Sequence, residues 1–144
     1  MAKFPLTFEA FTDMSPGMQN TWEGKADDLP PIPCAIPPEF GGPGKGYSPE
    51  DLFGLSILNC VLATFKVYAE KAEVNYQVAK GKVSLKMDKH PQENHLCITM
   101  VDLHVRVEGA SDQEKARKIL DQSVKECAIG NSIKSGKNFH LEVA

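Results

Sequence analysis

The most apolar stretch of the chain predicts a helix that begins just after Ser48. Ser48 is a good N-cap, Pro49 suits the first helical position, and Glu50 and Asp51 complement the positive end of the helix dipole. Apolar residues then occupy nearly every side of the helix as far as Lys66. Because a helix that is apolar all round is typically buried, we expect this one to be the buried central helix of the domain.

A second long helix is predicted after residue 110. Ser111 and Glu114 have the spacing of a capping box, which favours a helix start. Gly130 is a plausible stop. The predicted inner stripe has helical spacing and consists of Ala116, Ile119, Leu120, Ser123, Val124 and Cys127. Cys127 is therefore expected on the core side of the helix end.

Strands are predicted where apolar and polar residues alternate. Val83, Leu85 and Met87 alternate with a parity opposite to that of residues 74–78, which predicts a bulge at Gly81 in preference to a short turn. Together with residues 97–107 these segments predict an antiparallel hairpin. The other predicted strands are 6–11, 19–24 and 138–144. The order of elements indicates an α+β fold with mainly antiparallel sheets.

Residues 29–49 contain seven prolines and four glycines. This density of proline predicts an extended loop without regular hydrogen-bonded elements. Long loops in compact domains are often functional, as lids or binding loops. The alternative is a covering strap that packs Ile32, Ile36 and Phe40 on the body, and both interpretations remain open.

Composition narrows the class of protein. A chain of 144 residues with 42% hydrophobic and 24% charged residues suits one globular domain, residues 1–144. The net charge of −3 lacks the clustered basic residues that nucleic-acid binding needs. The N-terminus does not resemble a signal peptide, and no 18-residue apolar run is present, so we expect a cytoplasmic protein without a membrane span.

The four histidines predict no metal site and no cofactor. His95 and His104 are an odd number of residues apart, which places them on opposite faces of the predicted strand, so they cannot form a simple ligand pair. His90 falls in a turn, and His140 falls on the last strand.

The four cysteines are Cys34, Cys60, Cys97 and Cys127, and none belongs to a CxxC pair. Each alone is best interpreted as a small buried residue, except Cys34, which we expect to be exposed in the loop. Cys97 is expected in the core. Cys60 and Cys127 fall on the packed faces of the two predicted helices. If they meet, they would allow a thiol to pass through sulfenic acid to a disulfide, but spacing alone leaves that open.

Several motifs resemble those of the OsmC/Ohr family. Pro37-Pro-Glu-Phe-Gly-Gly-Pro-Gly is followed by Tyr47-Ser-Pro-Glu-Asp-Leu-Phe, and Cys60 lies ten residues after Glu50. Glu126-Cys-Ala-Ile-Gly-Asn-Ser-Ile resembles the second cysteine motif of the family. Trp22-Glu-Gly and Phe139-His-Leu-Glu-Val resemble its early and closing strands.

The resemblance implies an intertwined α+β homodimer that reduces organic hydroperoxides, with hydrogen peroxide as a second candidate substrate and a lipoyl or thioredoxin-like dithiol as reductant. At the matching positions, Cys60 would be the peroxidatic thiol, Cys127 the resolving thiol, and Glu50 the residue that orients a family arginine. Glu50 and Cys60 are about 15 Å apart along one helix, so Glu50 would have to serve the Cys60 of the second subunit.

One departure from the family pattern leaves a second function open. The expected arginine is missing from the early strands, because Arg106 and Arg117 come too late in the chain. Lys25 is the nearest candidate cation for the thiolate, although lysine lacks the bidentate fork of arginine. The alternative is a non-catalytic OsmC-like protein that binds a hydrophobic small molecule in the dimer cleft.

Overall fold

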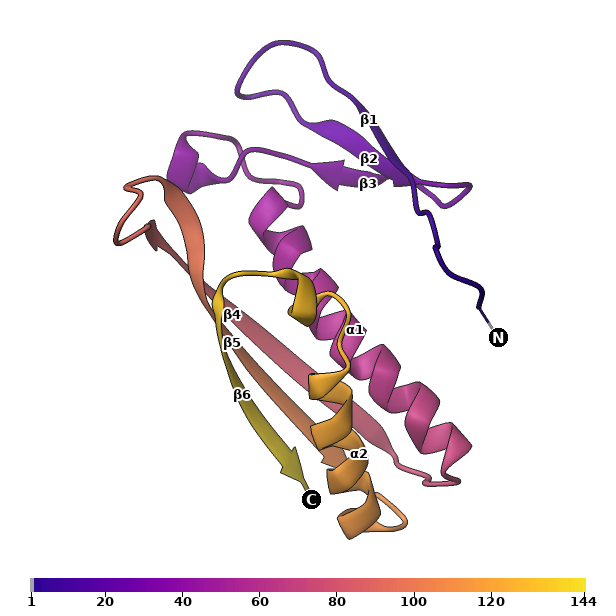
Figure 1. The fold of residues 1–144 in the computed structure, drawn as a ribbon. Helices are drawn as coiled ribbons and strands as arrows, with labels where there is room; N and C mark the ends of the chain where they lie inside the picture. The colour runs from indigo at the N-terminus through magenta and orange to yellow at the C-terminus, as the bar shows by residue number, and fades with distance from the viewer. Residues whose placement is uncertain (1) are drawn as a thin grey trace. The chain divides into compact units, whose positions relative to one another are not determined.

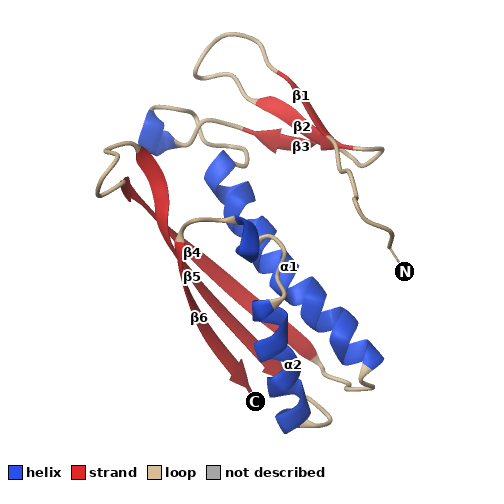
Figure 2. Cartoon of the chain, in the orientation of Figure 1, coloured by secondary structure: helices blue, strands red, loops and turns tan. Residues whose placement is uncertain are grey.

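The computed structural model describes residues 2–144 and shows two helices and two three-stranded sheets, which confirms the α+β prediction (Figure 2). The chain packs as two compact units, Met1–Leu52 and Phe53–Ala144. The elements, in order, are β1 (Ala10–Asp13), β2 (Trp22–Ala26), β3 (Ile32–Cys34), a 3-10 turn (Pro38–Phe40), α1 (Pro49–Lys71), β4 (Val78–Lys89), β5 (Leu96–Glu108), α2 (Gln113–Lys125), a second 3-10 turn (Gly130–Ser132) and β6 (Gly136–Val143).

The first unit contains the antiparallel sheet β1-β2-β3 (Figure 1). β1 and β2 lie a few residues later than predicted. β3 contradicts the expectation that residues 29–49 form no regular element. Pro33 lies in its middle opposite Glu23, and its carbonyl accepts a hydrogen bond from the Tyr47 N–H at 2.8 Å. β3 is an edge strand, the place where a sheet tolerates a residue without an N–H.

Steric constraints explain why the loop has glycine at positions 41 and 42. Gly41 ends the first 3-10 turn with a φ of 81°, in the left-handed region that glycine adopts at low cost. A Cβ on Gly42 would lie 2.0 Å from the carbonyl oxygen of Ile36. The chain therefore folds back on itself at a point where no side chain fits.

The second unit contains the sheet β4-β5-β6, in which β4 and β5 are antiparallel and β5 and β6 are parallel. The inner face of β5 is fully buried at Val101, Leu103 and Val107, as its alternation predicted. Both helices pack on this face of the sheet and share one core with β5 (Figure 1).

The prediction that α1 is buried all round is wrong for this chain. One side of the helix is buried, through Gly54, Ile57, Leu58, Val61, Phe65 and Ala69. Leu55 and Val67, on other sides, are 37% and 47% exposed. α1 is also long and apolar enough to cross a membrane by length and composition, contrary to expectation, although core helices of globular proteins meet the same criteria.

The predicted bulge at Gly81 is also misplaced. β4 pairs with β5 without interruption through Gly81, where a Cβ would lie 2.4 Å from Leu58 Cδ1. The register instead shifts between Lys86 and Met87. Beyond this shift Ile98 packs against the core, so Cys97 is only half-buried and is not a core residue.

Both helix starts carry side-chain caps. Ser48 Oγ accepts from the Asp51 N–H at 3.1 Å, and the Asp51 carboxylate accepts from the Ser48 N–H at 2.9 Å. These bonds confirm the first predicted cap. The second cap is one residue later than predicted, because Asp112, not Ser111, accepts from the Lys115 N–H at 2.9 Å.

Replacing Phe65 with alanine should destabilise the protein, because Phe65 is fully buried in the core that α1 shares with β5 and α2. We expect Phe65→Ala to lower the free energy of unfolding by about 3–5 kcal/mol in denaturant titration. The exposed neighbour Lys66 provides the control, and Lys66→Ala should change it by less than about 0.5 kcal/mol. Equal effects of the two substitutions would contradict the described packing of α1.

Candidate functional site

Cys60 lies near the middle of α1 and is half-buried. Its side chain packs against the hydrophobic core that α1 shares with β5 and α2. Its carbonyl accepts a hydrogen bond from Thr64 Oγ1 at 2.7 Å, one turn further along the helix. Cys60 is therefore held on a rigid element while its side chain remains partly accessible.

Cys127 lies just beyond α2, which ends at Lys125, and not on the helix as predicted. Its side chain is 1% exposed and faces the core, as predicted. The Gly130 N–H donates to Cys127 Sγ at 3.3 Å, and the Asn131 N–H donates to the Cys127 carbonyl at 2.9 Å. The turn after α2 thus folds around the sulfur atom.

The two cysteines are neighbours in this core. All four cysteines of the chain are free thiols. Burial raises the pKa of Cys127, the Gly130 N–H partly offsets this, and the adjacent Cys60 thiol raises the pKa further. Cys127 is therefore a protonated thiol at neutral pH. The fold of the second unit places it beside Cys60, which the sequence spacing alone left open.

Three side chains that sequence reasoning missed hold the Cys127 segment, residues 126–132. The Tyr68 hydroxyl on α1 donates to the Glu126 carboxylate, Gln122 Nε2 donates to its other oxygen at 3.0 Å, and Lys137 Nζ on β6 donates to the Gly130 carbonyl at 2.8 Å. Tyr68 and Glu126 are 58 residues apart, so no local pattern could have paired them.

Glu50 lies in the first turn of α1, ten residues before Cys60 on an uninterrupted helix. One of its carboxylate oxygens is buried and has no hydrogen-bond partner among residues 2–144. Buried carboxylates normally have a hydrogen-bond partner, so this oxygen is an exception among the described residues.

Lys25 lies on β2 in the first unit, directly opposite Phe11 of β1. Cys60 belongs to the second unit. The suggestion that Lys25 is the cation near the thiolate therefore stays a prediction.

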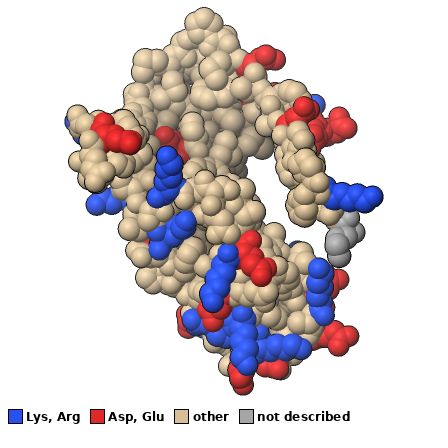
Figure 3. Space-filling view, in the orientation of Figure 1, with Lys and Arg blue, Asp and Glu red and all other residues tan. Residues whose placement is uncertain are grey.

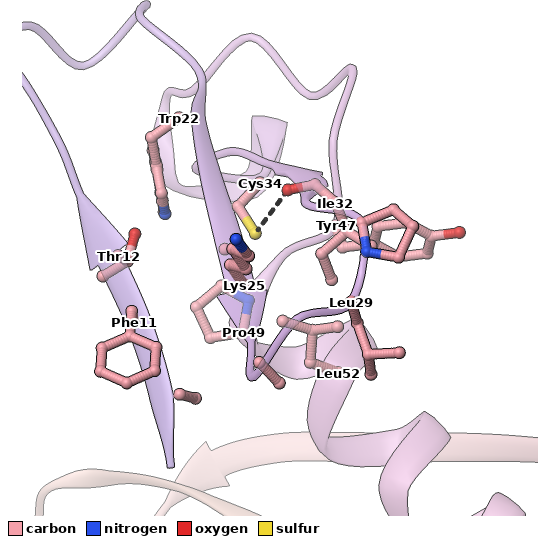
Figure 4. Close-up of a pocket in the computed structure, with 14 residues that line it drawn as sticks. Phe11, Thr12, Trp22, Lys25, Leu29, Ile32, Cys34, Tyr47, Pro49 and Leu52 are labelled. Carbon is pink, nitrogen blue, oxygen red and sulfur yellow. Dashed lines mark hydrogen bonds between the residues drawn. The ribbon is translucent and has the colours of Figure 1, made fainter.

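A cavity of about 520 Å³ lies on the β1-β2-β3 sheet, within the first unit (Figure 4). Most of its lining is apolar and comes from Ala10, Phe11, Thr12, Trp22, Gly24, Lys25, Ala26, Leu29, Pro30, Ile32, Cys34, Tyr47, Pro49 and Leu52. Cys34 is only 5% exposed and donates weakly to the Ile32 carbonyl at 3.7 Å, so the expectation of an exposed loop cysteine is wrong.

The histidines form two stacked pairs instead of lying apart. His104 and His140 face each other on β5 and β6 with ring centroids 4.2 Å apart, and His90 stacks on His95 at 5.4 Å. Within residues 2–144 no group of three or more His, Cys, Asp or Glu side chains is arranged to hold a metal ion. His95 precedes β5, so the opposite-face argument did not apply to it.

Comparison with known proteins identifies the family. The sequence profile of OsmC-like proteins matches residues 42–142, and this chain belongs to the OsmC-like family. MJ0573 of Methanocaldococcus jannaschii is 32% identical over 106 residues, which cover 69% of this chain and 54% of that protein. The chain thus spans about half the length of that relative.

Solved structures show the same fold. An OsmC-like protein from Vibrio cholerae superimposes with a TM-score of 0.82 at 15% identity, over 95% of this chain and 99% of that one. An organic hydroperoxide resistance protein OsmC from Legionella pneumophila has a TM-score of 0.72 at 22% identity, over 99% of each chain. At these identities the likeness concerns the fold.

The burial and raised pKa of Cys127 predict slow, pH-dependent alkylation of this thiol. Site-resolved mass spectrometry of the reduced protein with iodoacetamide should show modification of Cys127 that is slow at neutral pH. Its rate should rise about tenfold per pH unit, because only the thiolate reacts and its fraction grows until the pH reaches the thiol pKa. Half-buried Cys97 serves as the internal reference, and fast, pH-independent labelling of Cys127 would contradict the structure.

Proposed function

We propose that this protein is a thiol-dependent peroxidase that reduces organic hydroperoxides through Cys60 and Cys127. The observation that carries the proposal is the direct neighbourhood of the two free thiols in one core, on segments far apart in sequence. Membership of the OsmC-like family supports it.

The different environments of the two thiols favour different roles. Cys60 is half-buried, whereas Cys127 is 1% exposed with a raised pKa. In this proposal the Cys60 thiolate attacks the terminal peroxide oxygen, the O–O bond breaks, and the alkoxide takes up a proton and leaves as an alcohol. Cys127 then attacks the Cys60 sulfenic acid, releasing water and forming a disulfide.

A dithiol of the lipoyl or thioredoxin type would complete the cycle. One of its thiolates attacks the Cys60–Cys127 disulfide, and its second thiol displaces the mixed disulfide, so both cysteines return to thiols and the reductant leaves oxidised. We place this cycle in the cytoplasm, where such reductants keep thiols reduced.

Two features support a homodimer as the working form. The first unit exposes several large apolar side chains, and Figure 3 shows wide areas of the surface with few charged residues. These side chains are Phe4, Leu6, Phe8, Phe11, Met14, Met18 and Leu29. The buried unpaired oxygen of Glu50 is suited to a cation of a second copy, such as Lys25, and exposed apolar patches often mark such contacts.

The peroxidase proposal is tested by cysteine substitution in an assay with cumene hydroperoxide and dithiothreitol. Cys60→Ser should abolish peroxide consumption, because it removes the attacking sulfur. In a single-turnover experiment on the reduced protein without dithiothreitol, Cys127→Ser should consume about one equivalent and stop at the Cys60 sulfenic acid, whereas the wild-type protein should form the disulfide. Cys97→Ser is the matched control and should retain wild-type activity.

The proposal fails if the wild-type protein consumes no organic hydroperoxide with any dithiol. It also fails if Cys60→Ser is as active as Cys97→Ser.

A second candidate function is the binding of a hydrophobic small molecule, which the cavity of the first unit favours. Its volume of about 520 Å³ is within the usual range for ligand pockets, and its lining is mostly apolar. The cavity lies on the sheet of one chain, whereas the sequence suggested a cleft between subunits.

Trp22 is the one tryptophan of the chain and lines this cavity, so its fluorescence reports occupancy. Titration with anilinonaphthalene sulfonate should quench Trp22 by energy transfer if the cavity accepts apolar ligands. Ile32→Glu places a charge in the lining and should weaken binding at least about tenfold, since an unpaired charge is costly in an apolar site. Cys60→Ser should bind normally, and unchanged binding by Ile32→Glu would exclude this cavity.

A further inference from the structure

A hydrogen bond between side chains joins the helix that carries Cys60 to the segment that carries Cys127. The Tyr68 hydroxyl of α1 donates to a carboxylate oxygen of Glu126, the residue that caps the C-terminus of α2 and directly precedes Cys127. Gln122 Nε2 donates to the second oxygen of the same carboxylate at 3.0 Å. The carboxylate is therefore held from both helices.

Tyr68 is well placed to act on the thiol pair. Cys60, Thr64 and Tyr68 follow one another at intervals of four residues, so they lie along one side of α1. The Tyr68 ring packs against the core, and only its hydroxyl end reaches Glu126. The phenol thus bridges from the side of the helix that carries Cys60 to the segment with Cys127.

Two other hydrogen bonds of the Cys127 segment do not involve α1. Asn131 bonds back to the Cys127 carbonyl within the turn, and Lys137 ties the Gly130 carbonyl to β6. These bonds set the shape of the turn and anchor it to the sheet. Against α1, Cys127 Sγ lies beside the Cys60 thiol and makes a long contact to the Ile57 carbonyl at 4.0 Å.

We propose that Tyr68 is a positioning residue that keeps Cys127 within reach of Cys60 through its hydrogen bond to Glu126. This inference rests on the proposed redox role of the pair and adds a residue that acts through Glu126, without touching substrate. Without the hydroxyl, the segment loses this link to α1, and the two sulfur atoms meet less often.

The protonation of the pair suits this role. In the Tyr68–Glu126 pair, the hydrogen bond from Tyr68 lowers the pKa of Glu126, and the same bond raises the pKa of Tyr68. Glu126 therefore remains ionised and Tyr68 remains protonated across the neutral range. The contact weakens only when the pH falls through the lowered pKa of Glu126 or rises through the raised pKa of Tyr68.

The inference predicts a weaker Cys60–Cys127 disulfide in Tyr68→Phe. Equilibration of purified protein with reduced and oxidised dithiothreitol measures the exchange in which the reductant is oxidised and the protein disulfide becomes two thiols. We expect the equilibrium constant for disulfide formation in Tyr68→Phe to fall about threefold to tenfold, the effect of losing one hydrogen bond at an exposed carboxylate. Mass spectrometry identifies the disulfide formed.

Matched variants separate positioning from general destabilisation. Tyr76→Phe removes a phenol hydroxyl from a ring in the same core, whose centroid lies 5.2 Å from that of Phe65. It should leave the equilibrium constant for disulfide formation unchanged. Glu126→Ala should reproduce the loss, whereas Glu126→Gln keeps an acceptor and should retain most of the wild-type value. Tyr68→Phe combined with Glu126→Ala should be no worse than Glu126→Ala alone, because that single change has already removed the Tyr68–Glu126 bond.

Two results would overturn the inference, and they can be told apart. Equal equilibrium constants for Tyr68→Phe and Tyr76→Phe overturn the role of Tyr68 and leave the proposed function standing. Absence of a Cys60–Cys127 disulfide in the wild-type protein at every redox ratio overturns the proposed function, and the inference with it.

Discussion

Burial of the inner face of β5 against α1 and α2 is the interaction on which the second unit depends. β5 supplies alternate valines and leucine, α1 supplies Ile57, Val61 and Phe65, and α2 supplies Leu120. Each such side chain contributes about 1.5–3 kcal/mol when fully buried, so this core is the main source of stability. Because one cysteine sits on α1 and the other just after α2, the packing that stabilises the unit also brings the two thiols together.

The same packing makes the two thiols unequal. The sulfur of Cys127 is enclosed by a turn that donates the Gly130 N–H to it, yet burial outweighs this donor and keeps the thiol protonated. Cys60, on the partly exposed side of the helix, stays within reach of solvent. A pair with one accessible and one enclosed sulfur suits a cycle in which the first is oxidised and the second resolves it.

The first unit is built differently. Its sheet has short strands, an edge strand that contains a proline, and a sharp return at Gly41 and Gly42, where backbone fills the space a side chain would need. Much of its apolar surface is uncovered, and Glu50 keeps a buried oxygen without a partner within the described chain. Both features fit a unit that is completed by contact with a second copy, as the proposed dimer requires.

Local sequence determined both helices, the Ser48 cap, the hairpin and the buried face of β5, because periodicity and capping depend on neighbouring residues. Only the tertiary structure decided which faces are covered. The register shift at Lys86 moved Cys97 out of the core, and pairing with β2 allowed a strand at Pro33. The core of the second unit buries one side of α1. Sequence motifs singled out Cys60 and Cys127, but their contact and the Tyr68–Glu126 bond join distant segments, so only the folded core could show them.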